Sequence, residues 1–348
     1  MNAPEAVRLT TLSHGGGCGC KIAPALLQQI IARNASGVLP KELLVGIETS
    51  DDAAVYQINA SQAIVATTDF FMPIVDDPFD FGAIAATNAI SDVYAMGGTP
   101  LFALALVGMP INTLPARTIR RILEGGESVC ARAGIPVAGG HSIDSVEPIY
   151  GLVAIGLVDP HQVKRNADAR AGDKLVLGKP LGVGVYSAAF KKQLLDDDCY
   201  KALIVSTTQL NTPGPRLAEL AGVHALTDVT GFGLLGHLLE VCKGSKVAAT
   251  VDWKRVPLLA GVRELVQQGH KTGASGRNWS GYGDSVDLGS YGELEQALLT
   301  DPQTSGGLLV ACAPDTVEQV VALFRADGFQ EAAVIGEITA GAPGVKVA

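Results

Sequence analysis

The sequence of 348 residues lacks clustered positive charge and long apolar runs. It has 26 Lys and Arg against 35 Asp and Glu, a formal net charge of −9, and never more than two basic residues in succession. A protein that binds nucleic acid regardless of sequence needs a basic face to neutralise phosphates, and the charge argues against that class. The apolar run 101–107 is far shorter than the roughly 20 residues that span a bilayer, so we expect no membrane association.

A signal peptide and a disulfide framework are also missing. The first ten residues contain no apolar core of signal-peptide type, and we expect a cytoplasmic protein. The six cysteines follow no regular spacing, which argues against a disulfide-stabilised scaffold. Cys130, Cys242 and Cys312 lie in apolar segments and are expected to be small core residues. Cys18 and Cys20 remain as the pair of interest.

These two cysteines lie in the glycine-rich stretch 14–21, which reads His-Gly-Gly-Gly-Cys-Gly-Cys-Lys. Glycine allows turns that other residues cannot adopt, so the stretch predicts a flexible loop. The thiolate is the reactive form of cysteine, and a nearby cation lowers the thiol pKa, so Lys21 is placed to activate Cys18 or Cys20. Inert surface thiols or half of a metal site would give the same C-x-C pattern.

Strands and helices alternate along the chain, which is typical of an α/β or mixed α+β fold. In the first half we expect helices at 22–35, 80–95 and 115–133 and strands at 51–58, 62–68, 101–108, 135–139 and 149–158. The polar segment 159–173 predicts a linker. In the second half we expect strands at 174–178, 225–229, 247–252, 307–311 and 332–338 and helices at 232–242, 258–268 and 315–326. Residues 269–290 have no period and predict a mobile surface loop.

Aspartates gather at or beside the ends of apolar elements: Asp51, Asp52, Asp69, Asp92 and Asp228. A buried carboxylate is costly unless it is paired or binds a metal. Any one of these aspartates would also suit a helix cap or a turn, but their coincidence favours a shared site. Oxygen ligands of this kind suit Mg²⁺, which proteins hold with one or two carboxylates and substrate phosphates.

No standard nucleotide-binding motif is present, because the chain has neither G-x-x-x-x-G-K-[ST] nor G-x-G-x-x-G after a first strand. Gly139 and Gly140 follow a short apolar strand, where glycine lets backbone N–H groups approach an anion closely. His141 suits a phosphate contact or a structural role, and Ser142 suits a cap. The polar stretch 301–307 predicts an architectural turn into a strand.

Seven stretches together resemble the selenophosphate synthetase family, also called selenide, water dikinase. They are residues 14–21, 48–55, 67–76, 86–92, 139–144, 227–233 and 301–307. The likeness runs in the same order from about residue 8 to the last strand. The Cys-Gly-Cys-Lys loop distinguishes this family from aminoimidazole ribonucleotide synthetases, thiamine monophosphate kinases and hydrogenase maturation factors.

The resemblance implies a two-domain fold like that of aminoimidazole ribonucleotide synthetase. Residues 1–158 would form an N-terminal domain that binds ATP and metal and dimerises, with a mobile loop at 13–21, and residues 170–348 a C-terminal α/β domain. The implied reaction converts ATP, selenide and water into selenophosphate, AMP and phosphate. The implied partners are a second copy of the chain and a selenium-delivery protein.

The resemblance also assigns roles to residues. It implies that Cys18 is the selenium-handling nucleophile and Lys21 the phosphate-contacting lysine, and that Asp52, Asp92 and Asp228 bind Mg²⁺. The implied ATP contacts are Lys21, Thr49, Ser50, Asp51, Asp69, Asp92, Gly140, His141 and Ser142. Two other hypotheses remain open: an ATP-dependent relative that acts on another acceptor, and a thiol-based selenium or metal carrier or redox sensor on a nucleotide-binding scaffold.

Overall fold

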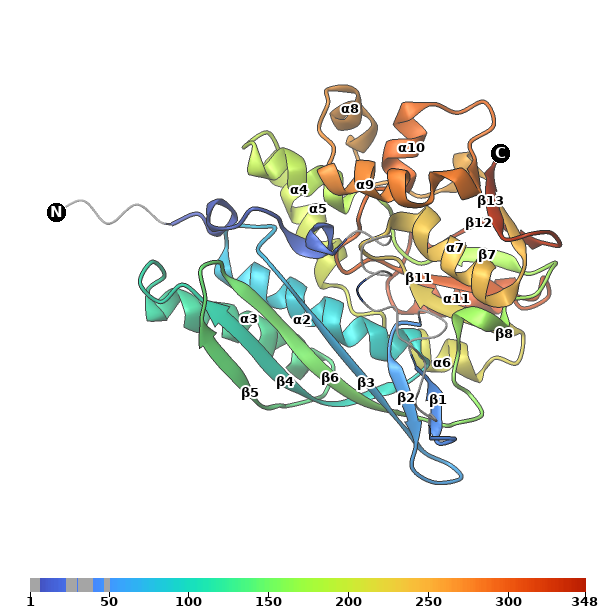
Figure 1. Ribbon diagram of the computed structural model, residues 1–348, viewed down its shortest axis with the longest axis horizontal. Helices are drawn as coiled ribbons and strands as arrows, with labels where there is room; N and C mark the ends of the chain where they lie inside the picture. Colours follow the sequence, from blue (N-terminus) through green and yellow to red (C-terminus); the bar gives the residue numbers. More distant parts are fainter. Residues whose placement is uncertain (1–6, 23–29, 31–39, 47–50) are drawn as a thin grey trace.

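The computed structural model describes residues 7–22, 30, 40–46 and 51–348, and in them the chain forms two β-sheets with helices packed on them (Figure 1). The first sheet has the strand order β1-β2-β3-β6-β4-β5. Its strands are β1 (Leu43–Val45), β2 (Ala54–Gln57), β3 (Ala63–Phe71), β4 (Thr99–Met109), β5 (Val137–Asp144) and β6 (Ile149–Val158). Most of the helix expected at 22–35 lies outside the described residues.

Helices α2 (Pro78–Ala95) and α3 (Ala116–Arg132) lie on one face of this sheet (Figure 1). Helix α2 begins where the Asp77 side chain accepts a hydrogen bond from the Asp80 N–H, with Pro78 at its first position. It ends before Gly97, whose φ of +76° ends the helical geometry. Nearly all of α2 is buried, because it contacts the first sheet on one side and β8 and α5 of the second half on the other. Its polar residues are therefore buried at the boundary between the two halves.

The second sheet has the strand order β10-β13-β9-β12-β7-β11-β8. Its strands are β7 (Lys174–Leu177), β8 (Val223–Asp228), β9 (Ala248–Val251), β10 (Val286–Asp287), β11 (Leu308–Cys312), β12 (Ala333–Thr339) and β13 (Gly344–Val347). The helices of this half are α4 (Val183–Lys191), α5 (Asp197–Thr208), α6 (Gly214–Glu219), α7 (Gly233–Ser245), α8 (Val262–Gln267), α9 (Gly273–Tyr282), α10 (Glu293–Leu299) and α11 (Val317–Ala326). The mixed α/β class predicted from the sequence is confirmed.

The core includes Cys130, Cys242 and Cys312, which are buried as predicted. Among the described residues, no helix is both long enough and apolar enough to span a membrane.

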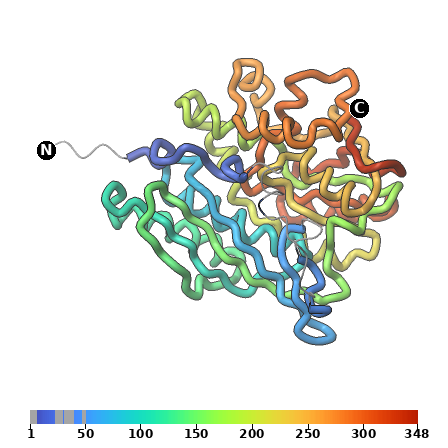
Figure 2. Tube along the Cα trace, in the orientation of Figure 1, coloured from blue at the N-terminus to red at the C-terminus, as the bar shows by residue number. Residues whose placement is uncertain are grey.

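The N-terminal segment runs to the junction of the two halves (Figure 2). It forms two short 3₁₀ helices, η1 (Leu9–Leu12) and η2 (Gly17–Cys20). Gly17 has a φ of +53°, and a Cβ there would lie 2.2 Å from Oγ1 of Thr304. Only glycine therefore lets the loop turn at this point and pack against the second half.

The strand expected at 135–139 is longer than predicted. β5 continues through Gly139 and Gly140 to Asp144, so these glycines do not end a strand. Ser142 also lies within β5 and is not a helix cap. The expectation was wrong because both glycines, with φ near +150°, lie within the strand and do not form a turn. A Cβ on Gly140 would lie 2.0 Å from the carbonyl oxygen of Ala105 on β4.

The mobile loop expected at 269–290 is also wrong, because it contains helix α9. Thr272 caps this helix by accepting a hydrogen bond from the Ser275 N–H. The buried face carries Ala274, Ser275 and Asn278, and Asn278 donates to the carbonyls of Gly231 and Thr300. A helix fixed by small and polar side chains gives little hydrophobic periodicity, which is why the pattern did not predict it.

Candidate active site

Three carboxylates meet at the junction of the two halves. Asp52 precedes β2, Asp92 lies on α2 and Asp228 ends β8. One oxygen from each lies within 4.8 Å of the others. The sequence grouped these aspartates by residue type alone, and the fold brings them together from three separate elements.

Hydroxyl groups orient each carboxylate. Oδ1 of Asp52 accepts a hydrogen bond of 2.9 Å from Thr227 on β8. Thr67 on β3 donates to Asp92, and Ser91 on α2 donates to Asp228. Two of these bonds, Thr227 to Asp52 and Ser91 to Asp228, cross between the halves, so the cluster also joins the two sheets.

Burial and neighbouring negative charge raise the pKa of all three carboxylates. Burial raises the pKa of Asp52 and of Asp92, and the charge of Asp228 raises both further. Burial also raises the pKa of Asp228, against the opposing effect of its hydrogen bond from Ser91. Oδ2 of Asp52 is buried and accepts no hydrogen bond from the described residues. An unpartnered oxygen among like charges fits a hard divalent cation such as Mg²⁺.

Cys18 lies beside this cluster and is 2% exposed. Its thiol donates to Oδ1 of Asn88 at 3.2 Å, and its backbone N–H donates to Oγ1 of Thr304 at 3.0 Å. The same Asn88 oxygen accepts the Ser305 N–H at 2.7 Å, while the Asn88 amide group donates to Asp69. Asn88 therefore connects the glycine loop, the first sheet and the second half.

Lys21 lowers the pKa of both thiols, as the sequence predicts, but burial and the charge of Asp69 outweigh this effect. Burial and the charge of Asp69 raise the pKa of Cys18 well above its usual value, and the opposing effect of Lys21 is smaller. Burial also raises the pKa of Cys20, whose thiol donates to the Gly17 carbonyl at 2.7 Å. Burial alone would lower the pKa of Lys21, but Asp69, Cys18 and the other aspartates raise it overall. Burial therefore favours the protonated form of both thiols, and the neighbouring carboxylates favour the charged form of the lysine.

The remaining implied ATP contacts are spread out. Asp69 lies within β3 rather than at its end, and it accepts from Asn88. Asp51 accepts the backbone N–H of Asn166 at 2.6 Å, in the segment that joins the two halves. Thr49 and Ser50 lie outside the described residues.

Gly140, His141 and Ser142 are exposed on the edge strand β5. Gly140 pairs with Ala105, Ala105 with Leu152, and Leu152 with Asp69. Neighbouring strands are roughly 4.8 Å apart, so these residues lie about 14 Å from Asp69 across the sheet. Within one chain the structure does not bring them to the carboxylates.

Sequence reasoning missed the turn at 301–307 as part of the site. Thr304 and Ser305 contact the glycine loop and Asn88, although the stretch was expected to be an architectural turn into a strand. A signal was present, since adjacent hydroxyl residues before two glycines supply both side-chain and backbone hydrogen bonds. Its partners were not visible, because Cys18 and Thr304 are 286 residues apart.

Family models match both halves of the chain. The model of the AIR synthase related protein N-terminal domain matches residues 50–158, and that of the C-terminal domain matches residues 170–347. Among solved structures, thiamine-monophosphate kinase from Stenotrophomonas maltophilia has a TM-score of 0.66 at 24% identity, covering 93% of this chain and 95% of its own. Hydrogenase maturation protein HypE in complex with ATP has a TM-score of 0.60 at 18% identity, with 88% of each chain covered. These structures share the fold.

Curated relatives are much more similar. A selenide, water dikinase from Dechloromonas aromatica (strain RCB) is 68% identical over 344 residues, which is 99% of each chain. One from Rhizobium meliloti (strain 1021) is 57% identical over 98% of each chain. Identity of this extent covers both domains and the glycine loop. The chain belongs to the selenide, water dikinase family, within the AIR synthase related fold.

Proposed function

We infer that the chain converts ATP, selenide and water into selenophosphate, AMP and phosphate. The observation that carries this function is the hydrogen-bond chain that links a buried thiol to a buried carboxylate next to the aspartate cluster. Cys18 donates to Asn88, and Asn88 donates to Asp69 beside Lys21 and Asp92. A site that must hold both selenium and a polyphosphate needs these two kinds of group side by side.

We propose that the N-terminal domain, residues 1–158, holds ATP and that the cluster holds magnesium. Asp52, Asp92 and Asp228 would be the Mg²⁺ ligands. When bound, Mg²⁺ neutralises phosphate charge and stabilises charge that develops during transfer. Lys21 is buried and charged, so it can position the phosphates from the loop side. A relative of the same fold bound to ATP supports the nucleotide assignment.

The proposed chemistry has two steps. Hydroselenide attacks the γ-phosphorus, so that a selenium–phosphorus bond forms, the bond from the γ-phosphorus to the bridging oxygen breaks, and ADP stays enclosed in the site. Water then attacks the β-phosphorus of the enclosed ADP, the second anhydride bond breaks, and AMP and phosphate leave with protons released to solvent. Because the site must control the access of water in both steps, we propose that loop 13–21 closes over it during turnover.

We also propose a homodimer that forms through the N-terminal sheet. Helices α2 and α3 cover one face of this sheet (Figure 1). Phe71 packs against Phe81 of α2, so the adjacent Phe70, 51% exposed, points to the other face. Ile143 on the edge strand β5 is also exposed. Burying these side chains would favour association. A second copy would then supply Gly140 to Ser142, which one chain leaves away from its own cluster.

The carrier hypothesis is not favoured. A carrier or redox sensor needs an accessible, ionisable thiol, whereas burial raises the pKa of Cys18 and leaves it 2% exposed. The high identity to curated selenide, water dikinases also favours the enzyme.

A matched pair of serine variants tests the role of Cys18. Serine at position 18 keeps a donor to Asn88, so Cys18→Ser should bind ATP as the wild type does but lose selenide-dependent AMP formation. Cys20→Ser, two residues away, should keep most of the activity. Retention of selenide-dependent turnover by Cys18→Ser would contradict the assignment.

A further inference from the structure

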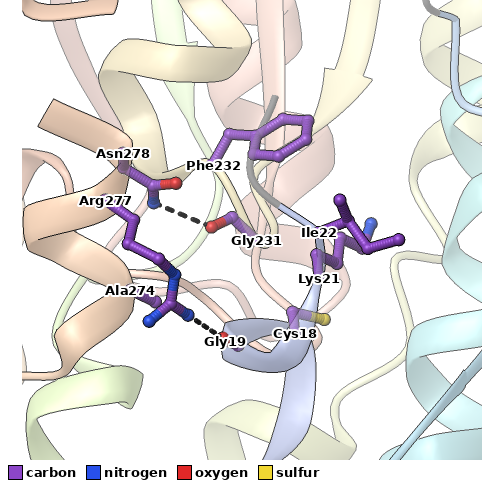
Figure 3. A pocket seen from close by; sticks show the side chains of 9 residues that line it. All are labelled: Cys18, Gly19, Lys21, Ile22, Gly231, Phe232, Ala274, Arg277 and Asn278. Atoms are coloured by element: carbon purple, nitrogen blue, oxygen red, sulfur yellow. Dashed lines mark hydrogen bonds between the residues drawn. The ribbon is translucent and has the colours of Figure 1, made fainter. Parts of the chain in front are cut away.

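A small crevice lies between the glycine loop and helix α9 (Figure 3). Cys18, Gly19, Lys21 and Ile22 line it from the loop, Gly231 and Phe232 from the segment after β8, and Ala274, Arg277 and Asn278 from α9. Ile22 at its outer end is 49% exposed, and Cys18 at its inner end is 2% exposed. The crevice therefore reaches from the surface to Cys18, whose sulfur lies on the side away from Arg277 (Figure 3) and donates to Asn88.

The size of the crevice limits what can pass. Its free volume is about 10 Å³, close to the minimum of roughly 10–15 Å³ that holds one water molecule. A diatomic hydride such as hydroselenide is larger than a water molecule, so its passage requires the lining side chains to move apart. A selenium atom carried on another protein's side chain cannot pass while the loop is seated.

The charge of the crevice favours an anion. Arg277 lines it from α9 and supplies its positive charge. Lys21 lines it from the loop with an aliphatic chain that faces Gly231, while its ammonium charge interacts with buried aspartates. Arg277 is exposed and donates from Nη2 to the Gly19 carbonyl at 2.9 Å. In the described part of the chain, no carboxylate forms an ion pair with Arg277 within 4.0 Å. Its charge thus remains available at the entrance, on a protein whose net charge of −9 otherwise repels anions.

We propose that this crevice is the inlet for selenide and that Arg277 attracts it there as the free hydroselenide anion. The inference rests on the proposed function and names the form of selenium that enters the site. Arg277 binds the incoming anion and positions the loop through Gly19, while the phosphate chemistry takes place on the far side of Cys18. Loss of the arginine charge should therefore affect selenide and leave ATP unaffected.

The test uses full-length Arg277→Gln, which keeps a neutral donor for Gly19, and Arg277→Lys, which keeps the charge. AMP formation is measured anaerobically with free selenide. For Arg277→Gln we expect KM for selenide to rise about tenfold, at the lower end of electrostatic steering effects, with kcat and KM for ATP unchanged. Arg277→Lys should stay within about twofold of wild type, as should Arg325→Gln, an exposed arginine on α11.

Salt supplies a readout that a merely structural role would not change. Because screening weakens attraction between exposed charges, kcat/KM for selenide should fall with ionic strength in the wild type and change little in Arg277→Gln. Equal KM values for selenide and equal salt dependence in the wild type and Arg277→Gln would overturn the inlet proposal. Failure of every protein, wild type included, to form AMP from selenide would instead overturn the proposed function.

A blocking variant tests the passage itself. Ala274 is buried, and a Cβ on Gly19 would lie 3.7 Å from the Ala274 Cβ, so Ala274→Val should fill the gap between loop and helix. We expect kcat/KM for selenide to fall at least tenfold with the ATP dissociation constant unchanged. Unchanged kcat/KM for selenide in a folded Ala274→Val protein would show that selenide enters elsewhere.

Discussion

Asn88 has the widest set of contacts among the site residues. Its oxygen accepts from Cys18 and from Ser305, and its amide group donates to Asp69. The backbone N–H of Ser305 fixes which end of the amide faces the thiol, because a backbone N–H can only donate. The orientation of Cys18 therefore depends on residues from both halves.

Thr304→Val tests this arrangement at the Cys18 backbone. Valine has nearly the shape of threonine but cannot accept the Cys18 N–H, and an unsatisfied buried N–H costs about 1–3 kcal/mol. The seated loop should lose that stabilisation, and selenide-dependent kcat/KM should fall by about 5- to 150-fold. ATP binding measured by calorimetry should not change. Weaker ATP binding would place Thr304 in the nucleotide site instead.

Lys179 gives the protein a specific pH dependence. It is 2% exposed and donates to the carbonyls of Gln209 and Ser305, and burial lowers its pKa to about 7 although Asp228 opposes the shift. The unfolded chain keeps this proton up to a pH of about 10, so between pH 7 and 10 the unfolded state binds more protons and stability rises with pH.

The comparison is between the wild type and Lys179→Met in urea unfolding at pH 7, 8 and 9. The free energy of unfolding of the wild type, minus that of the variant, should increase by up to about 1.4 kcal/mol per pH unit. A difference that is constant over this range would show that Lys179 stays protonated in the folded protein.

At the scale of elements, the sequence predicted those helices and strands whose residues show a clear hydrophobic periodicity. Helix α2 was expected at 80–95 and is Pro78–Ala95, because its buried faces are apolar and its ends carry strong signals. Helix α9 was not predicted, because hydrogen bonds from Ser275 and Asn278, rather than apolar side chains, hold its buried face. The carboxylates could be singled out by type and position, but the hydroxyl groups that orient them could not, since the pairs lie 25 to 175 residues apart.

Gly17→Ala tests the seating of the loop. Alanine at a φ of +53° costs about 1–2 kcal/mol, and its Cβ would overlap Thr304 and Ile74. We expect the loop to detach, so that proteolysis at residues 13–21 becomes faster and selenide-dependent turnover falls at least tenfold, while the unfolding midpoint changes little. Gly273→Ala, which meets only the end of a flexible arginine, is the control. Equal protease sensitivity of Gly17→Ala and wild type would contradict this account.

On the scale of the whole molecule, the site exists only where the two halves meet. Asp52 and Asp92 come from the first half and Asp228 from the second, and their mutual repulsion opposes the packing that brings them together. Hydrogen bonds from Thr227 and Ser91 across the junction compensate in part. A bound cation would turn this repulsion into attraction, which couples metal binding to the stability of the junction.

Asp228→Asn should separate these effects in thermal unfolding. Without metal the variant should unfold a few degrees above the wild type, because it removes one of three like charges and keeps an oxygen for Ser91. With Mg²⁺ at 100 times its dissociation constant the wild type should gain about 2.7 kcal/mol, and the variant should gain little. Equal stabilisation of both proteins by Mg²⁺ would exclude Asp228 as a ligand.

The central claim is that one site joins selenium to a phosphate of ATP. Anaerobic ³¹P nuclear magnetic resonance of the wild-type protein with ATP, Mg²⁺ and selenide tests it directly. The account predicts equal amounts of AMP, inorganic phosphate and a product whose phosphorus couples to selenium, all dependent on selenide. ADP as the only product, formed equally without selenide, would contradict it.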